Sequence, residues 1–402
     1  MLLSAETVRC QSDLVMFDRL LEDLTVKRVN EQIERAAKKD GGRTGLRRRL
    51  LSTSVRLSEA MAPDLRRIAN ECSERLELGI DLELYVYPSP VYNAMCFKSE
   101  ASRLFVMFSS SLLEAFTDEE LKFVMGHELG HHVYNHHEIP IGYILRGGTR
   151  PDPRLALDLF TWSRYAEISA DRAGAHCAQD LLSVSRALFK LASGLSGTTV
   201  QFQLDDFLAQ VDAMQIEDAV PGQGAPKEDW FSTHPFSPLR VKALTLFHNS
   251  ELAGGTQSRH DLEVAVQGVM SLMEPSYLDG RTDTAENMRR LLFAGALVVA
   301  NADGTISEEE VAIFEKFFGK GAFSDSLNLD ALADDLEDRI AQVREMASTP
   351  QAMQVLRDLC LVARSGGRIS QVETDVLNEI ADGLGVPREF VCQSLDSELE
   401  LD

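Results

Sequence analysis

The sequence predicts an α+β fold that is mostly helical, with one small antiparallel sheet and an all-α C-terminal domain. Apolar residues recur at helical spacing through most of the 402 residues. Between Asp81 and Ser109 the pattern alternates and is rich in β-branched and aromatic residues, with turn residues such as Pro88 and Pro90 between the segments. Helical patterns then return, and the stretch from Glu286 to Asp402 carries 23 acidic and 10 basic residues.

These changes along the chain predict four regions. Residues 1–78 form an N-terminal helical region that packs on the next domain, and residues 79–250 form the domain that contains the sheet. Residues 251–285 are polar and contain glycine, so we expect a linker. Residues 286–402 form the acidic helical domain.

Composition limits the class of protein. The net charge of -23 argues against nucleic acid as a partner, because phosphate binding needs a basic surface. The six cysteines are scattered without a C-x-x-C pair, which is typical of reduced thiols in the cytoplasm. The N-terminus lacks the features of a signal peptide, and the longest apolar run, Leu291–Ala300, is shorter than the about 20 residues of a membrane span. We therefore expect a cytoplasmic protein without a membrane span.

The motif HELGH, residues 127–131, lies on a predicted amphipathic helix. Thr117 and Glu120 have the spacing of a capping box at its start, and Pro140 is expected to stop it. Residues i and i+4 share a helix face, so His127 and His131 can occupy two corners of a tetrahedral zinc site. The alternative is a surface helix with incidental histidines.

Glu128 lies about 100° round the helix from His127. This position is unsuited to ligation but within reach of a metal-activated water, from which Glu128 can take a proton as general base. Gly130 leaves a smooth surface where a neighbouring element can approach.

A catalytic zinc site needs a third protein ligand, and two residues are candidates. His137 has the spacing of the metzincin pattern, but Tyr134 replaces the glycine at which that chain turns, so we expect the helix to continue. Glu167 lies on the next long predicted helix, about Asp152 to Asp180, with Asp171 one turn further on. Glu167 is then the third ligand and Asp171 accepts the free N–H of a ligating histidine, unless the two acids are exposed partners of nearby arginines.

Four features in order resemble the zinc peptidases typified by HtpX and the CAAX prenyl proteases, family forty-eight of the metallopeptidases. They are Asn93-Ala94 before a β segment, HELGH with His136 five residues after it, Glu167 with Asp171, and His234-Pro235 with Arg240. The resemblance covers roughly residues 60–250 and implies a zincin-like peptidase domain in residues 79–250.

The resemblance also implies roles for these residues. His127, His131 and Glu167 would hold one Zn²⁺ per chain, with Glu128 as the base. His234 would face the substrate cleft and stabilise the oxyanion of the tetrahedral intermediate, and Arg240 would help to order that side of the cleft. Glu128, His234 and Arg240 form the expected catalytic set. The segment at Asn93 and Ala94 would pair with an extended substrate peptide. His132 and His136 are expected to lie outside the ligand set. Many members of this family span membranes, and this chain resembles a soluble type.

The acidic domain contains NADGTISEEE, which invites comparison with a calcium-binding EF-hand loop. Position 1 of that loop would be Val299, which has no ligating oxygen, so we expect a helix–turn–helix without calcium. The motif recurs in weaker form 63 residues later, with Gly367 opposite Gly304. The repeated pattern over about residues 286–392 resembles TerB-like helical domains, which implies a regulatory protein partner for residues 286–402.

We therefore expect a zinc metalloendopeptidase that hydrolyses peptide bonds of a protein or peptide substrate through a zinc-activated water, with Glu128 as general base. The alternative is a non-enzymatic or latent zinc-containing stress-response scaffold that acts through its acidic C-terminal domain. Polar segments at about 216–229 and 250–284 would occlude the cleft in that case.

Overall fold

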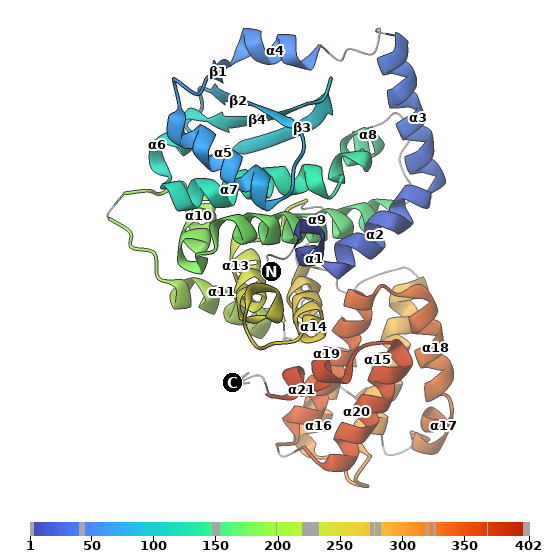
Figure 1. Cartoon of the computed structure of the whole chain (residues 1–402). Coiled ribbons are helices and arrows are strands. Elements are labelled where there is room, and N and C mark those ends of the chain that lie inside the picture. The colour runs from blue at the N-terminus through green and yellow to red at the C-terminus, as the bar shows by residue number, and fades with distance from the viewer. Residues whose placement is uncertain are drawn as a thin grey trace. The chain divides into compact units, whose positions relative to one another are not determined.

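The computed structural model of the chain has two compact units (Figure 1). It describes residues 4–39, 45–146, 153–197, 199–218, 233–273, 277, 283–318, 321–324, 327–367 and 369–396. Residues 1–208 and 232–259 form the first unit, and residues 209–231 and 260–402 form the second. The chain passes from the first unit to the second within helix α11 (Leu204–Asp218). No described helix is both long enough and apolar enough to cross a lipid bilayer.

The first unit combines a four-stranded sheet with helices. Its strands are β1 (Val55–Leu57), β2 (Asp81–Tyr87), β3 (Ala94–Glu100) and β4 (Arg103–Ser109). Its helices are α1 (Ala5–Val8), α2 (Gln11–Glu22), α3 (Leu24–Lys39), α4 (Leu46–Thr53), α5 (Pro63–Arg75), α6 (Ser110–Ala115), α7 (Asp118–Val133), η1 (His136–Glu138), α8 (Ile141–Arg146), α9 (Pro153–Ala178), α10 (Leu181–Ser193), α13 (Ser237–Asn249) and η2 (Glu251–Ala253).

The sheet is mixed, with the strand order β1-β2-β4-β3, so the prediction of a purely antiparallel sheet was wrong. Ala101 and Ser102 both have positive φ and close a tight hairpin, which makes β3 and β4 antiparallel. Strand β4 is the most apolar strand and takes a central position, with Phe105 and Val106 fully buried on opposite faces. Strand β2 then pairs with the other edge of β4 in parallel. Strand β1, inside the N-terminal region expected to be helical, pairs antiparallel with β2.

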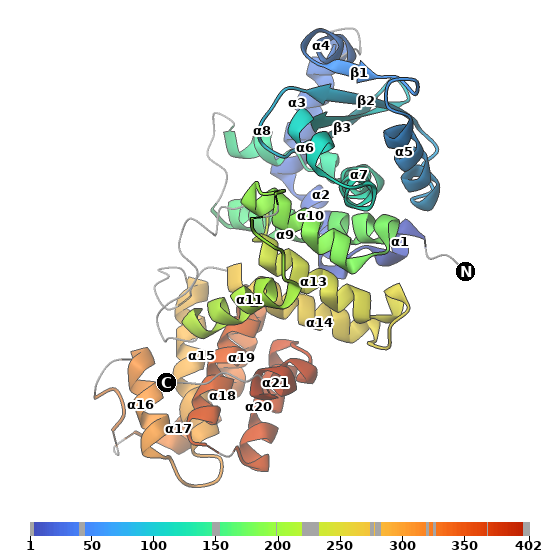
Figure 2. The same cartoon turned by 90° about the vertical axis from the view of Figure 1, so that its left-hand side faces the viewer.

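Helices cover both faces of the sheet (Figures 1 and 2). On one face, Leu104 and Val106 of β4 pack in the main core of the unit with residues of α5 and α7. On the other face, Tyr85 and Phe105 pack against Leu50 of α4. Helix α7 therefore lies between the sheet and α9, and strand β3 at the edge of the sheet contacts α7.

Helices α7 and α9 pack closely because glycines face the contact. A Cβ atom added to Gly130 would lie 2.8 Å from Cβ of Ala173, and one added to Gly174 would lie 2.6 Å from the carbonyl oxygen of Phe123. Cβ atoms do not approach other atoms so closely in folded proteins. The expectation that Gly130 allows a neighbouring element to approach is therefore confirmed.

The two ends of α7 were predicted with different success. The capping box at its start is present: the Thr117 hydroxyl accepts from the Glu120 amide, and the Glu120 carboxylate accepts from the Thr117 amide. The helix ends at Val133, before Pro140, because Asn135 adopts a left-handed conformation with φ of 56°. The expectation that the helix continues past Tyr134 was therefore wrong.

The second unit is all-helical. Its helices are α14 (Arg259–Met270), η3 (Ser271–Met273), α15 (Asp283–Ala300), α16 (Glu308–Phe318), α17 (Leu329–Asp334), α18 (Leu336–Met346), α19 (Thr349–Ser365), α20 (Gln371–Leu384) and α21 (Arg388–Asp396). Helices α15 and α19 carry many of the buried apolar residues of its core.

The internal repeat is visible in this unit. Helix α15, the turn at Gly304 and α16 correspond to α19, the turn at Gly367 and α20, and both glycines have positive φ. Each second helix begins with a serine and glutamate that cap each other, Ser307 with Glu310 and Ser370 with Glu373. The two serines are 63 residues apart, as are the two glutamates and the two glycines.

The turn before α16 does not resemble a calcium loop. Val299, at the expected first ligand position, is fully buried in the core. The Asp303 carboxylate instead accepts hydrogen bonds from the amide and hydroxyl of Thr305 within the turn.

Two polar segments, about 216–229 and 251–285, were singled out in the sequence. Most of the first, about 216–229, lies outside the described residues. The second, 251–285, contains helix α14, because Leu262, Val266 and Val269 recur at helical spacing and are buried.

Candidate metal centre

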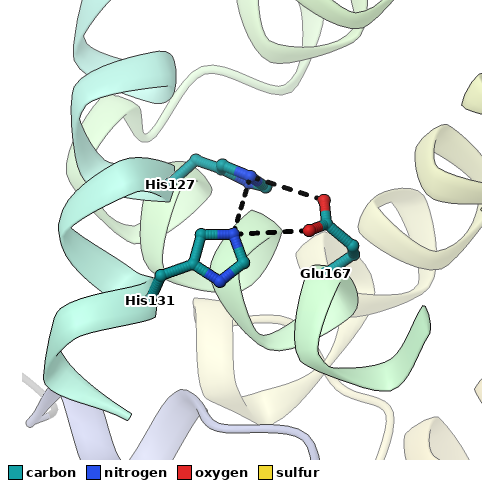
Figure 3. Close-up of side chains that lie close together, drawn as sticks. All are labelled: His127, His131 and Glu167. Carbon is teal, nitrogen blue, oxygen red and sulfur yellow. Dashed lines mark hydrogen bonds and ion pairs between the residues drawn. The ribbon is translucent and has the colours of Figure 1, made fainter. Parts of the chain in front are cut away.

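Two histidines of α7 and one glutamate of α9 converge on one point (Figure 3). Nε2 of His127 lies 3.3 Å from Nε2 of His131. The Glu167 carboxylate lies 3.5 Å from Nε2 of His127 and 3.4 Å from Nε2 of His131. One possible ligand atom from each residue lies within 4.8 Å of those of the other two, and no other group of three such residues was found in the described part of the chain.

The chemistry of these donors fits a zinc ion. Two imidazole nitrogens and one carboxylate form a donor set of catalytic zinc sites in which a fourth position stays open. Glu167 is buried, and its Oε2 atom has no hydrogen-bond partner among the described residues. Burial alone would raise the pKa of Glu167, but hydrogen bonding and charge from the surrounding histidines lower its pKa well below the usual value. A carboxylate that is buried and ionised, has one oxygen without a hydrogen bond and lies beside two imidazoles is suited to bind a divalent cation.

The outer nitrogen of His127 contacts Asp171, as the sequence predicted. Nδ1 of His127 lies 2.9 Å from Oδ1 of Asp171, which is fully buried one turn after Glu167. Arg240 holds the same carboxylate from α13, with Nε donating to Oδ2 at 2.8 Å and Nη2 donating to Oδ1 at 2.6 Å. Burial opposes ionisation of Asp171, but the charge and hydrogen bonds of Arg240 outweigh it and lower its pKa.

Nδ1 of His131 makes the first of two successive polar contacts, through His136 to Asp13. Nδ1 of His131 lies 2.8 Å from Nδ1 of His136, and Nε2 of His136 lies 3.1 Å from Oδ2 of Asp13 in α2. Burial lowers the pKa of His136 and so favours its neutral form. The rings of His131 and His136 are steeply inclined to each other, with an interplanar angle of 69°.

Comparison with known proteins identifies the region that carries these residues. Residues 59–146 and 154–247 match the model of peptidase family M48. The region that carries the candidate metal centre is therefore similar to peptidase family M48. Residues 289–393 match the model of the tellurite resistance protein TerB, which agrees with the repeat in the second unit. The predicted resemblances to both families are therefore confirmed.

Curated relatives support the M48 assignment. The chain is 34% identical over 169 residues to the plastoglobule-localized metallopeptidase 48 of Arabidopsis thaliana, which covers 40% of this chain and 49% of that protein. It is 28% identical over 218 residues to a protease HtpX homolog of Paenarthrobacter aurescens and 29% identical over 220 residues to one of Pseudarthrobacter chlorophenolicus. These matches cover 47% of this chain and 73% of each relative. The chain thus spans about half the length of the plastoglobule relative. No solved structure matches the chain.

Within the M48 region, Glu128 lies on α7, the helix that contacts the edge strand β3. Its side chain is mostly buried, and its negative charge adds to burial in raising the pKa of Cys96 in β3. Glu128 is not part of the group formed by His127, His131 and Glu167. The role of Glu128 as general base stays a prediction.

The remaining predicted residues of the M48 region lie around the centre. His234 is exposed, and its Nε2 lies 3.5 Å from Oε1 of Glu167. Asn93 directly precedes β3, where its amide donates to the Ser109 hydroxyl, and Ala94 is the first residue of that edge strand. His137 lies outside the ligand group, and burial lowers its pKa to about 4.

Asp13 was not singled out in the sequence. A signal for it exists, because Asp13 shares a helix face with Phe17 and Leu20, and all three are buried. An acid on the apolar stripe of an amphipathic helix needs partners inside the protein. Asp13 also lies outside the M48 match, which begins at residue 59.

Proposed function

We propose that this chain is a zinc-dependent metalloendopeptidase whose metal ligands are His127, His131 and Glu167. The observation that carries the proposal is the convergence of two Nε2 atoms and one buried carboxylate between α7 and α9. The names of the curated relatives, a metallopeptidase and HtpX-type proteases, support the same reaction class. Asp171 supports the proposal as well, because a carboxylate on the outer nitrogen is the usual partner of a ligating histidine.

A zinc ion held by these residues would act as a Lewis acid and lower the pKa of a water towards about 7. The Glu128 carboxylate would take the proton from the attacking water and deliver it to the nitrogen of the leaving amine. The burial of Glu128 supports this role, because a carboxylate with little access to solvent keeps the proton within the site.

The substrate would be an extended peptide that pairs with β3. This strand lies at the edge of the sheet, pairs with β4 on one side, and contacts the helix that carries HELGH. Addition of a strand to an open edge aligns a peptide through main-chain hydrogen bonds. Asn93 and Ala94 at the start of β3 would hold the part of the peptide nearest to the site.

His234 and Arg240 would act on the side of the site formed by Glu167 and Asp171. His234 is exposed and close to Glu167, so its Nε2 could donate to the carbonyl oxygen of the bond under attack. Arg240 is buried and binds Asp171 in a bidentate pair, which suits it to ordering the wall rather than contacting the peptide.

The test compares the wild type with Glu128→Gln. We expect both proteins to bind one zinc ion per chain and the variant to lose at least about 100-fold in cleavage of casein or a fluorogenic peptide. Glu119→Gln is the matched control, because Glu119 lies on the same helix and its side chain is 42% exposed in an ion pair with Lys122. Equal cleavage by the wild type and Glu128→Gln would disprove the proposal.

The alternative function is a zinc-containing scaffold that acts through residues 286–402. The presence of a TerB region in the same chain favours considering it. Full zinc occupancy without cleavage, even after proteolysis of the polar segment at about residues 216–229, would favour the scaffold. The regulatory partner of this region stays a prediction.

A further inference from the structure

Asp13 is fully buried and is held by four hydrogen-bond donors. Oδ2 accepts from Nε of Arg9 at 2.8 Å, from Oγ of Ser169 at 2.7 Å and from Nε2 of His136 at 3.1 Å. Oδ1 accepts from Nε1 of Trp162 at 3.0 Å. Burial opposes the ionised form, but the hydrogen bonds from His136 and Arg9 outweigh it and keep the pKa of Asp13 well below the usual value. Asp13 is therefore an ionised carboxylate that only accepts hydrogen bonds.

This fixed acceptor determines where the protons of the two histidines lie. Because Asp13 accepts, Nε2 of His136 carries a proton and donates it. In the neutral ring, Nδ1 of His136 is then an acceptor, and the contact at 2.8 Å requires Nδ1 of His131 to be the donor. A proton on Nδ1 of His131 leaves its Nε2 with a free lone pair, and this atom faces His127 and Glu167.

We propose that Asp13 is a positioning residue that fixes, through His136, the tautomer in which His131 presents Nε2 to a metal ion. The inference rests on the proposed role of His131 as a zinc ligand. His127 has a one-step version of the same arrangement, in which Asp171 accepts directly from Nδ1. Each carboxylate is in turn held by an arginine, Arg9 for Asp13 and Arg240 for Asp171. The N-terminal helix thus supplies a part of the site that lies outside the M48 match.

The test is the zinc dissociation constant of the full chain, measured in competition with a chromophoric chelator. Asn in place of Asp13 cannot satisfy the four donors, because its amide group donates where one carboxylate oxygen accepts. We expect Asp13→Asn to weaken zinc binding by about 10-fold or more, which is typical for partners of ligating histidines. The visible spectrum of the cobalt(II)-substituted variant is expected to change too, because the orientation of His131 changes.

A second pair of variants tests the relay at His136. His136→Gln can donate from its amide nitrogen to Asp13 and accept from His131 at its amide oxygen, whereas His136→Leu can do neither. We expect His136→Gln to retain zinc affinity within about threefold of the wild type and His136→Leu to lose about 10-fold or more. Equal affinities of these two variants would overturn the proposal, even if Asp13→Asn fails to fold.

Asp158→Asn is the matched control. Asp158 of α9 pairs with Arg19 of α2 at 3.0 Å, so Asp158→Asn neutralises an ion pair between the same two helices. This variant is expected to bind zinc like the wild type. A folded Asp13→Asn protein that also binds zinc like the wild type would overturn the proposal. Zinc affinity and peptide cleavage are separate readouts, so a wild type that binds zinc but cleaves nothing would refute the proposed activity alone.

Discussion

Oδ1 of Asp171 lies 2.9 Å from Nδ1 of His127, and the two residues come from different helices, α9 and α7. A carboxylate in this position accepts the Nδ1 proton and leaves Nε2 of His127 free to bind a metal. The spacing of Glu167 and Asp171 by four residues places both on one face of α9, so a single helix provides both a candidate ligand and the partner of another.

The first prediction concerns the pair of Asp171 and Arg240. Asp171→Asn is expected to weaken zinc binding by about 10- to 100-fold, because the amide no longer compels His127 to donate from Nδ1. Arg240→Lys keeps the positive charge but loses the bidentate geometry, so we expect a smaller loss. Chelator competition measures both constants. Unchanged affinity in a folded Asp171→Asn protein would contradict this role.

The second prediction concerns the close contact of α7 and α9. Gly130→Ala places a Cβ atom 2.8 Å from Cβ of Ala173, and Gly126→Ala places one 2.8 Å from Sγ of Cys177. Each substitution is expected to lower the free energy of unfolding by about 1–3 kcal/mol, because the helices must move apart. It should also weaken zinc binding, since the ligands come from both helices.

Gly142→Ala is the control for these substitutions. Gly142 lies in helix α8, and a Cβ atom added there meets no other atom within 4 Å. We expect a gain of about 0.5–1 kcal/mol in the free energy of unfolding from higher helix propensity. Chemical denaturation followed by circular dichroism measures all three variants, and destabilisation of Gly142→Ala alone would refute the contact argument.

Local signals in the sequence were enough to predict much of the candidate site. The capping box at Thr117, the i, i+4 spacing of the two histidines and the i, i+4 spacing of Glu167 and Asp171 are all properties of single helices. Gly130 signalled that another helix packs against α7, and that helix is α9. Such features depend on residues within one or two helical turns of each other, so their spacing in the sequence is enough to predict them.

The features that were missed depend on distant partners. The parallel pairing of β2 with β4 follows from β4 occupying the centre of the sheet, which the strand patterns alone do not specify. Asp13 reaches the site from 123 residues before His136, so no local spacing connects them. The end of α7 at Val133 follows from the left-handed conformation of Asn135, which a non-glycine residue adopts only in particular surroundings.

The third prediction concerns the two capping glutamates of the repeat. Glu310 and Glu373 are buried, and burial together with the nearby charge of Glu373 raises the pKa of Glu310. A carboxyl group with a raised pKa in the folded state contributes stability below its ordinary value of 4.5, and loses it as the pH rises through the folded value. At pH 7 the ionised Glu310 therefore opposes folding of the second unit.

Glu310→Gln removes this charge and can still donate to Glu373 and accept from Ser307. We expect the variant to be more stable than the wild type at pH 7 by about 1 kcal/mol, the typical value of a buried hydrogen bond. The difference should shrink as the pH falls through the raised pKa of Glu310 to 4.5, and should stay constant below that pH. Glu309→Gln, at an exposed position of the same helix turn, should show no such dependence. A gain of equal size at every pH would contradict the role of the Glu310 charge.

The fourth prediction concerns removal of the metal and discriminates between His131 and His137 as ligands. A ligand present at 100 times its dissociation constant stabilises the folded state by about 2.7 kcal/mol, which corresponds to a rise of several degrees in the unfolding temperature. We expect a chelator to abolish that rise in the wild type and added zinc to restore it.

His131→Asn should show no response to zinc, because one of the three converging donors is lost. His137→Asn should respond like the wild type, because His137 lies outside the ligand group although it follows the motif at metzincin spacing. Differential scanning calorimetry of the full chain measures these shifts, and loss of the zinc response in a folded His137→Asn protein would mean that Glu167 is not the third ligand.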